Sequence, residues 1–236
     1  MNAGTSVAAG DVELKASSAT DLGNGSTAFA SYHIDAKLSG SANSADAVTV
    51  GLKGDWGTFM MGEAPAGTSF AEVAGDINGD PSPELAAAIA YVGTAGDITF
   101  AVGMVPSGSS ASDATTMGFS YKSDMFTLGA GSTTYSNDTK DTLVGISTSF
   151  EAFTVGFMTG DMTDKSADAI KLGWSEGDIS ANYIVANNDN VSTSESSSRL
   201  TVVYNMGGGT KVIFRAHSDA AGTAKDYNSV ELGHSF

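Results

Sequence analysis

Residues 227–236 read YNSVELGHSF. In an extended strand Val230, Leu232 and Phe236 fall on one face, while Glu231 and Ser235 fall on the other. The ends of soluble domains usually fray into water, so an aromatic residue at the end of a strand predicts a different setting. In a sheet closed within a bilayer the last strand must pair with the first, and a terminal aromatic ring lies well at the lipid–water interface.

The same two-residue alternation runs along nearly the whole chain. We count fifteen such strands from Asp11 onward, and a short strand within residues 1–9 makes sixteen. Short connectors, such as 54–57, alternate with long polar ones, such as 64–84, 160–167 and 187–196. An even strand number with short turns at one end and long loops at the other is the layout of outer-membrane barrels. The sequence therefore predicts an all-β fold: a transmembrane antiparallel β-barrel of sixteen strands.

The composition suits a β-rich envelope protein. Charged residues are 16% of the 236 residues, below the roughly 25% of a usual soluble protein. No Cys is present, so disulfides and thiolate metal sites are excluded. The net charge of −16 repels nucleic-acid phosphates and attracts cations. The first residues, MNAGTS, show no signal-peptide pattern, and we interpret the chain as a mature form whose signal has been removed.

A soluble β-sandwich and a β-solenoid are alternatives, because both show alternation and polar loops. The outer face of a sandwich is usually rich in Lys, Glu and Arg, whereas the polar face here is mostly Gly, Thr and Ser. A calcium-binding solenoid has a fixed short repeat, and the sequence shows none. The pattern favours a barrel with a wet lumen over either soluble fold.

Two stretches resemble the general porins of Gram-negative bacteria. Residues 12–25 read VELKASSATDLGNG and continue into a returning strand to Asp35, like an early hairpin of that family. Residues 50–63 read VGLKGDWGTFMMGE, like the tight turn before the family's third loop, and the final Phe236 matches as well. The resemblance implies a single barrel domain over 1–236, placed in the outer-membrane lipid, forming a homotrimer and passing small hydrophilic solutes and ions passively. It also implies that the third loop folds inward and narrows the pore.

On this alignment the constriction loop is Ala64–Glu84. Its acidic residues, including the one at its root, are Glu63, Glu72, Asp76, Asp80 and Glu84. No Lys or Arg occurs between Lys53 and Lys122, and acidic charge at a constriction attracts cations and resists anions. The alternative is that these acids belong to an ordinary solvated loop.

Many members of the family carry an Arg cluster on the wall opposite this loop. This chain has only two Arg, and Met60 stands where a basic residue is common. Alternation directs several basic residues into the lumen, and the expected basic side of the constriction is Lys53, Arg199, Lys211 and Arg215. Such a sparse basic wall predicts a pore that prefers cations or is weakly selective.

Within the loop, Asp76, Asn78 and Asp80 have the oxygen spacing of the first half of a calcium loop. The second half is missing, because no Gly follows Asp80 and no acid stands at the twelfth position. An Asp-rich turn without metal is the competing interpretation. A bound Ca²⁺ would reduce the negative charge of the loop, and no cofactor is required for passive transport.

Enzymatic chemistry finds little support in the sequence. The chain has no Cys and only three His, so few side chains can act as a nucleophile or as a general base. We therefore expect a protein that is not an enzyme. A plugged or enzymatic outer-membrane barrel and an adhesive or structural surface protein are the alternatives.

Overall fold

The computed structural model describes residues 11–37, 44–74, 84–108, 113–162, 165–190, 194–219 and 226–234. The strands are β1 (Asp11–Asp21), β2 (Ser26–Lys37), β3 (Ser44–Gly54), β4 (Gly57–Pro65), β5 (Glu84–Ala95), β6 (Ile98–Val105), β7 (Ala114–Lys122), β8 (Phe126–Tyr135), β9 (Lys140–Phe150), β10 (Phe153–Met162), β11 (Lys165–Glu176), β12 (Ile179–Asn190), β13 (Ser194–Gly207), β14 (Thr210–Asp219) and β15 (Tyr227–His234). A short 3-10 helix, η1 (Gly67–Ala71), lies between β4 and β5. Among these residues no helix combines the length and the apolar character needed to span a membrane.

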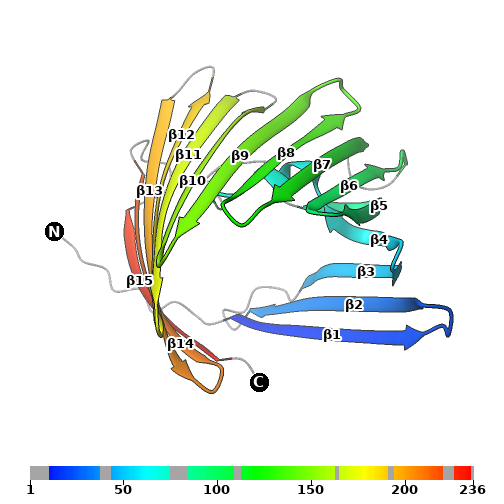
Figure 1. Cartoon of the computed structure of the whole chain (residues 1–236), viewed down its shortest axis with the longest axis horizontal. Helices are drawn as coiled ribbons and strands as arrows, with labels where there is room; N and C mark the ends of the chain where they lie inside the picture. Colours follow the sequence, from blue (N-terminus) through cyan, green and yellow to red (C-terminus); the bar gives the residue numbers. More distant parts are fainter. Residues whose placement is uncertain are drawn as a thin grey trace.

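The fifteen strands form one antiparallel sheet in which each strand pairs with its neighbours in sequence. Figure 1 shows this sheet curving around a central space, with β1 and β15 as its two edges. The predicted fifteen strands from Asp11 onward are confirmed, whereas the sixteenth strand expected within residues 1–9 and the terminal Phe236 lie outside the described residues. The sandwich and solenoid alternatives are wrong, because the described strands form a single sheet with antiparallel pairing throughout.

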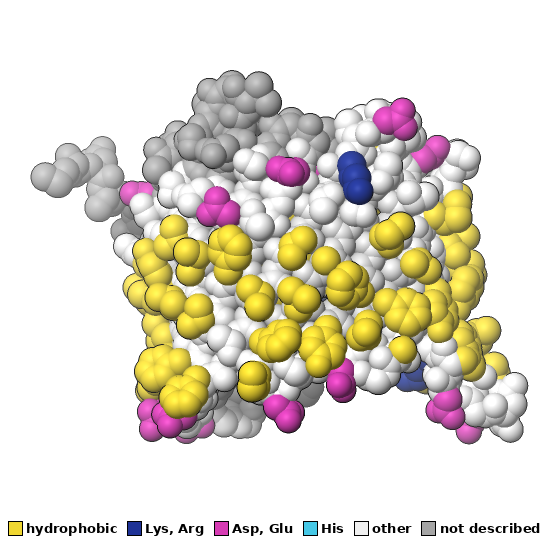
Figure 2. Space-filling model, turned by 45° about the horizontal axis from the view of Figure 1, so that its top comes forward, with side chains coloured by type: hydrophobic (Ala, Val, Ile, Leu, Met, Phe, Trp, Pro, Cys, Tyr) yellow, Lys and Arg dark blue, Asp and Glu magenta, His cyan; other side chains and the backbone are white. Residues whose placement is uncertain are grey.

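The outer face of the curved sheet carries large, exposed apolar side chains. Met117 is 63% exposed and Leu232 is 74% exposed, while Thr116, next to Met117 on the opposite face, is 5% exposed. Figure 2 shows these apolar side chains as a belt, with acidic side chains above and below it. A belt of exposed apolar side chains is unfavourable in water and is the band that a barrel presents to lipid. The alternation predicted from the sequence is therefore confirmed as an outer apolar face and an inner face.

The turn between β1 and β2 shows how the sequence reverses a strand. The Asp21 carboxylate accepts a hydrogen bond from the Gly23 N–H at 2.8 Å, and the Asn24 side-chain oxygen accepts one from the Ser26 N–H at 3.1 Å. The positive φ angles, 77° and 76°, fall on Gly23 and Gly25. Glycine adopts this backbone conformation without a steric penalty, so the glycines define the turn.

At the opposite end several strands run further than the apolar pattern predicts. β10 ends at Met162 and β11 begins at Lys165, inside the loop predicted over residues 160–167. β12 and β13 likewise extend into the loop predicted over 187–196. The ladder is made by main-chain groups, so Asp, Asn and Ser continue the pairing after the apolar alternation has stopped.

Candidate functional site

The segment that follows β4 lies on the inner face of the sheet. η1 contacts β7, β8 and β9, and Figure 1 shows it inside the curve of the sheet. The side chains of Thr68, Ala71 and Ala74 are fully buried there. The part of the predicted loop that the structure describes, up to residue 74, is thus held against the inner wall.

Five inner-face glycines make this close approach feasible, and we call them the glycine track: Gly118, Gly129, Gly131, Gly145 and Gly156. A Cβ on Gly118 or Gly131 would overlap the carbonyl oxygen of Gly67. A Cβ on Gly129 would overlap the Phe70 carbonyl, and one on Gly145 the Ala71 carbonyl. At the end of the track, a Cβ on Gly156 would lie 3.0 Å from the Val73 carbonyl oxygen. The loop backbone therefore occupies the space that side chains would fill on these strands.

A buried hydroxyl pair fixes the start of η1. The Gly67 N–H donates to the Thr116 Oγ1 at 2.5 Å, and the Thr116 and Thr133 hydroxyl oxygens lie 3.0 Å apart. Both threonines are almost fully buried, at 5% and 1% exposure. A buried N–H needs a partner, so Thr116 satisfies the first donor of the helix and ties it to β7 and β8.

Next to the glycine track the inner face is apolar. Ala71 and Ala74 pack in one cluster with Leu143, Met158 and Ala169 from β9, β10 and β11. The expectation of a polar, water-lined inner face is therefore wrong for this part of the wall. The sequence held a signal, since Leu143 and Met158 stand at inner-face positions among small polar residues, but alternation alone does not show which inner residues a loop covers.

Two of the predicted acids come together at the root of the loop. Glu63 and Glu84 both line a pocket of about 290 Å³, together with Thr49, Ser69 and Pro65. The Thr49 hydroxyl donates to the Glu63 carbonyl oxygen at 3.0 Å, which holds the end of β4 against β3. Glu72 follows η1 directly, and one of its carboxylate oxygens is buried. Asp76, Asn78 and Asp80 lie outside the described residues, so the calcium loop stays a prediction.

The predicted basic residues occupy two regions of the inner face. Lys53 lines a pocket of about 330 Å³ beside Phe29, Ser31 and Thr58. Arg199 lies on β13, with Lys211 and Arg215 on the adjacent β14, as predicted. Figure 1 shows η1 and β13–β14 on different sides of the central space.

The structure adds partners that the sequence pattern did not identify. Arg215 forms an ion pair with Glu231 of β15, so part of the predicted basic charge is offset. Arg199 pairs in register with His217, whose ring stacks on Tyr227 at a centroid distance of 5.2 Å. Glu231, His217 and Tyr227 share the inner face with the arginines. Alternation had already placed Glu231 on the face opposite the apolar one, but it does not give the register that makes these residues neighbours. Within the described ranges no group of three His, Cys, Asp or Glu residues could hold a metal ion.

The fold is similar to that of porins whose structures have been solved. A multiple mutant of the Rh. blastica porin matches with a TM-score of 0.78 at 15% identity, covering 94% of this chain and 89% of that one. A triple mutant of the Rhodopseudomonas blastica porin has a TM-score of 0.75, and a structure described as "Asymmetric conductivity of engineered proteins" has one of 0.76. Both are 15% identical and cover 94% of this chain and 88% of theirs. At such identity the likeness shows the fold alone.

No curated protein matches the chain. The model of the family described as Gram-negative porin, however, matches residues 2–236, almost the entire length. The protein therefore belongs to the Gram-negative porin family.

Proposed function

We propose that the protein is a general diffusion porin of the outer membrane, which passes small hydrophilic solutes and ions passively through a water-filled pore. The observation that carries this proposal is the position of residues 66–74, held on the inner face of a sheet whose outer face is an apolar belt (Figures 1 and 2). A loop in this position narrows an aqueous path, while the belt faces lipid. Family membership and fold point to a channel rather than an enzyme.

The proposal includes a barrel closed by sixteen strands. Residues 1–9 would supply the strand between β15 and β1, the two edges of the described sheet. Closure is supported by a physical requirement, because unpaired N–H and C=O groups at a sheet edge are unfavourable in the hydrocarbon region. In the membrane we expect three copies of the barrel to associate.

We further propose that the pore prefers cations. Glu63 and Glu84 meet at one pocket, and Glu72 lies directly after η1. On the opposite side Glu231 offsets Arg215. Excess negative charge beside a narrow aqueous path raises the local concentration of cations.

Planar-bilayer recording of the purified protein under a KCl gradient tests both the pore and its cation preference. Stable conductance steps, grouped in threes, with a reversal potential that favours K⁺ are the expected result. Steps with anion preference would retain the porin and refute the proposed role of the acids. Absence of conductance from a folded, heat-modifiable protein would refute the porin and favour a plugged barrel or a surface structural protein.

The loop acids are tested by neutralising Glu72, Asp76, Asp80 and Glu84 together, as Gln or Asn. Cation preference should fall, because four negative charges leave the constriction. A control that removes a single carboxylate outside the loop replaces Glu151, in the short turn after β9, with Gln. Unchanged selectivity in the fourfold variant would reject the role of the loop without affecting the porin assignment.

A further inference from the structure

A furrow on the outer face spans β6 to β9, with Ala130 and Ser132 of β8 in its lining. Among the outward side chains of β8, those near the β7–β8 turn, Phe126 and Leu128, are large. Those toward the end of the strand, Ala130, Ser132 and Thr134, are small. On one side the furrow is bordered by Met117 and Phe119 of β7, and the depression has a volume of about 370 Å³ with a mainly apolar lining. The small residues thus open a groove in a belt that is otherwise bulky.

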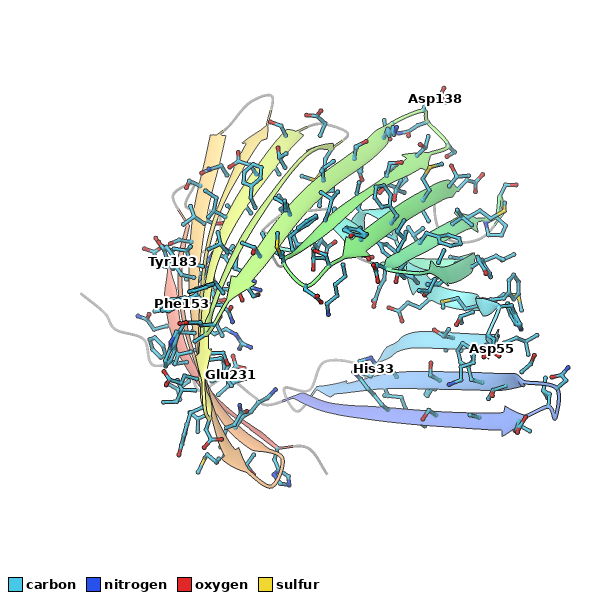
Figure 3. All side chains as sticks on the ribbon, in the orientation of Figure 1. His33, Asp55, Asp138, Phe153, Tyr183 and Glu231 are labelled. Atoms are coloured by element: carbon cyan, nitrogen blue, oxygen red, sulfur yellow. The ribbon has the colours of Figure 1, made fainter. Side chains whose placement is uncertain are left out.

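A single cation stands at one end of this furrow. In the strand register Ser132 lies opposite Thr142, and Thr134 lies opposite Lys140, so Lys140 is beyond the apolar section. Lys140 is exposed and is one of the residues that line the groove. Figure 3 labels Asp138 at the tip of the β8–β9 hairpin, which places Lys140, the first residue of β9, near that rim of the sheet.

Lys140 differs from the other basic residues in the face it occupies. Its neighbours in alternation, Thr142 and Val144, belong to the outer face, where Val144 is 44% exposed. The remaining basic residues with described side chains stand at inner-face positions: Lys15, Lys53, Lys122, Lys171, Arg199, Lys211 and Arg215. Within the described part of the chain Lys140 makes no ion pair. It is therefore the one described cation on the lipid-facing side, and its charge is available.

We propose that this furrow is a lipid site, in which part of one acyl chain lies over Ala130 and Ser132 and a phosphate-bearing headgroup contacts the Lys140 ammonium. The apolar section matches an acyl chain, and the lysine at its end matches a phosphate in charge and position. The protein carries a net charge of −16 and repels anionic headgroups elsewhere. An anionic lipid is therefore attracted to the furrow, because Lys140 is the outward cation at its end. The site lies outside the pore, so it does not depend on the proposed transport.

Native mass spectrometry can measure the lipids that the folded protein retains. The protein is reconstituted with equal amounts of phosphatidylglycerol and phosphatidylcholine that have the same acyl chains and differ in headgroup charge. The wild type should retain the phosphatidylglycerol in excess, by about five-fold, the contribution of one lysine near a membrane surface. Lys140→Gln should remove most of this excess while the single-channel conductance stays unchanged.

Two further variants separate the parts of the site. Ser132→Leu fills the furrow and should reduce retention of both lipids. Lys122→Gln removes the same charge from the inner face at the other end of the sheet and should retain lipids like the wild type. A wild type without preference, a Lys140→Gln variant with unchanged preference, or an equal loss in Lys122→Gln would each overturn the proposal. Unchanged retention in Ser132→Leu would overturn the acyl-chain groove.

Discussion

At the scale of single residues, the loop is positioned by glycines of the inner wall, which have no side chains to keep it away. The glycine track lets the backbone of residues 67–73 contact the backbone of β7–β10 directly. Thr116 adds a directional bond, since its hydroxyl accepts from the Gly67 N–H. The loop is thus held by steric fit and one buried hydrogen bond, both of which respond to single substitutions.

Gly131→Ala should displace the loop. The new Cβ would overlap the Gly67 carbonyl oxygen, and overpacking of this kind costs about 1–3 kcal/mol. Because the wall lies on one side, the loop can move only toward the lumen, so we expect a lower unfolding midpoint in urea and a smaller single-channel conductance. In the control, Gly233→Ala, the nearest atom is a flexible Lys211 side-chain carbon at 3.2 Å. Equal effects in the two variants would contradict a specific role for the track.

At the scale of elements, β14 and β15 combine opposite charges on one inner surface. Arg215 and Glu231 are 31% and 48% exposed, respectively, and ion pairs exposed to this degree contribute about 0–1 kcal/mol. Their pairing therefore matters more for the field inside the sheet than for folding. It reduces the basic charge that faces the acidic loop.

Glu231→Gln should lower the preference for K⁺ in bilayer recordings, because it removes a negative charge and leaves Arg215 uncompensated. The unfolding midpoint should barely change, for the reason given above. Glu176→Gln, at the end of β11 beside a short turn, removes the same charge away from the arginine and serves as the control. An unchanged K⁺ preference after Glu231→Gln would show that this pair does not contribute to the field in the pore.

At the scale of the whole molecule, the charges are distributed by face. The described basic side chains, except Lys140, lie on the inner face, and the apolar belt separates acidic side chains above and below it (Figure 2). The net charge of −16 adds a long-range attraction for cations. Salt screens such a field but does not change the width of the pore.

The K⁺ preference should therefore decrease with ionic strength. The screening length is about 10 Å in 0.1 M salt and about 3 Å in 1 M salt, so gradients of the same ratio centred on these concentrations should give different reversal potentials. The larger K⁺ selectivity is expected at the lower concentration. A selectivity independent of salt would assign it to contacts at the narrowest point rather than to the charge of the whole protein.

The sequence alone was sufficient for the architecture of the described residues. Alternation with a period of two is a local property, so it indicated the fifteen strands, the outward direction of residues such as Met117 and the inward direction of Arg199 and Arg215. It also located the long connector after β4 and its acids. Where it failed, at the ends of β10 to β13, main-chain pairing continued beyond the apolar residues.

Only the tertiary structure decided which of these residues meet. The contact of Gly67 with Gly131, the ion pair of Arg215 with Glu231 and the groove that ends at Lys140 all depend on the register of neighbouring strands and on the path of the loop across them. A period of two assigns each residue to a face but gives no position across the sheet. The side-chain pattern therefore determined the two faces of this protein, and the folded chain determined what lies on each of them.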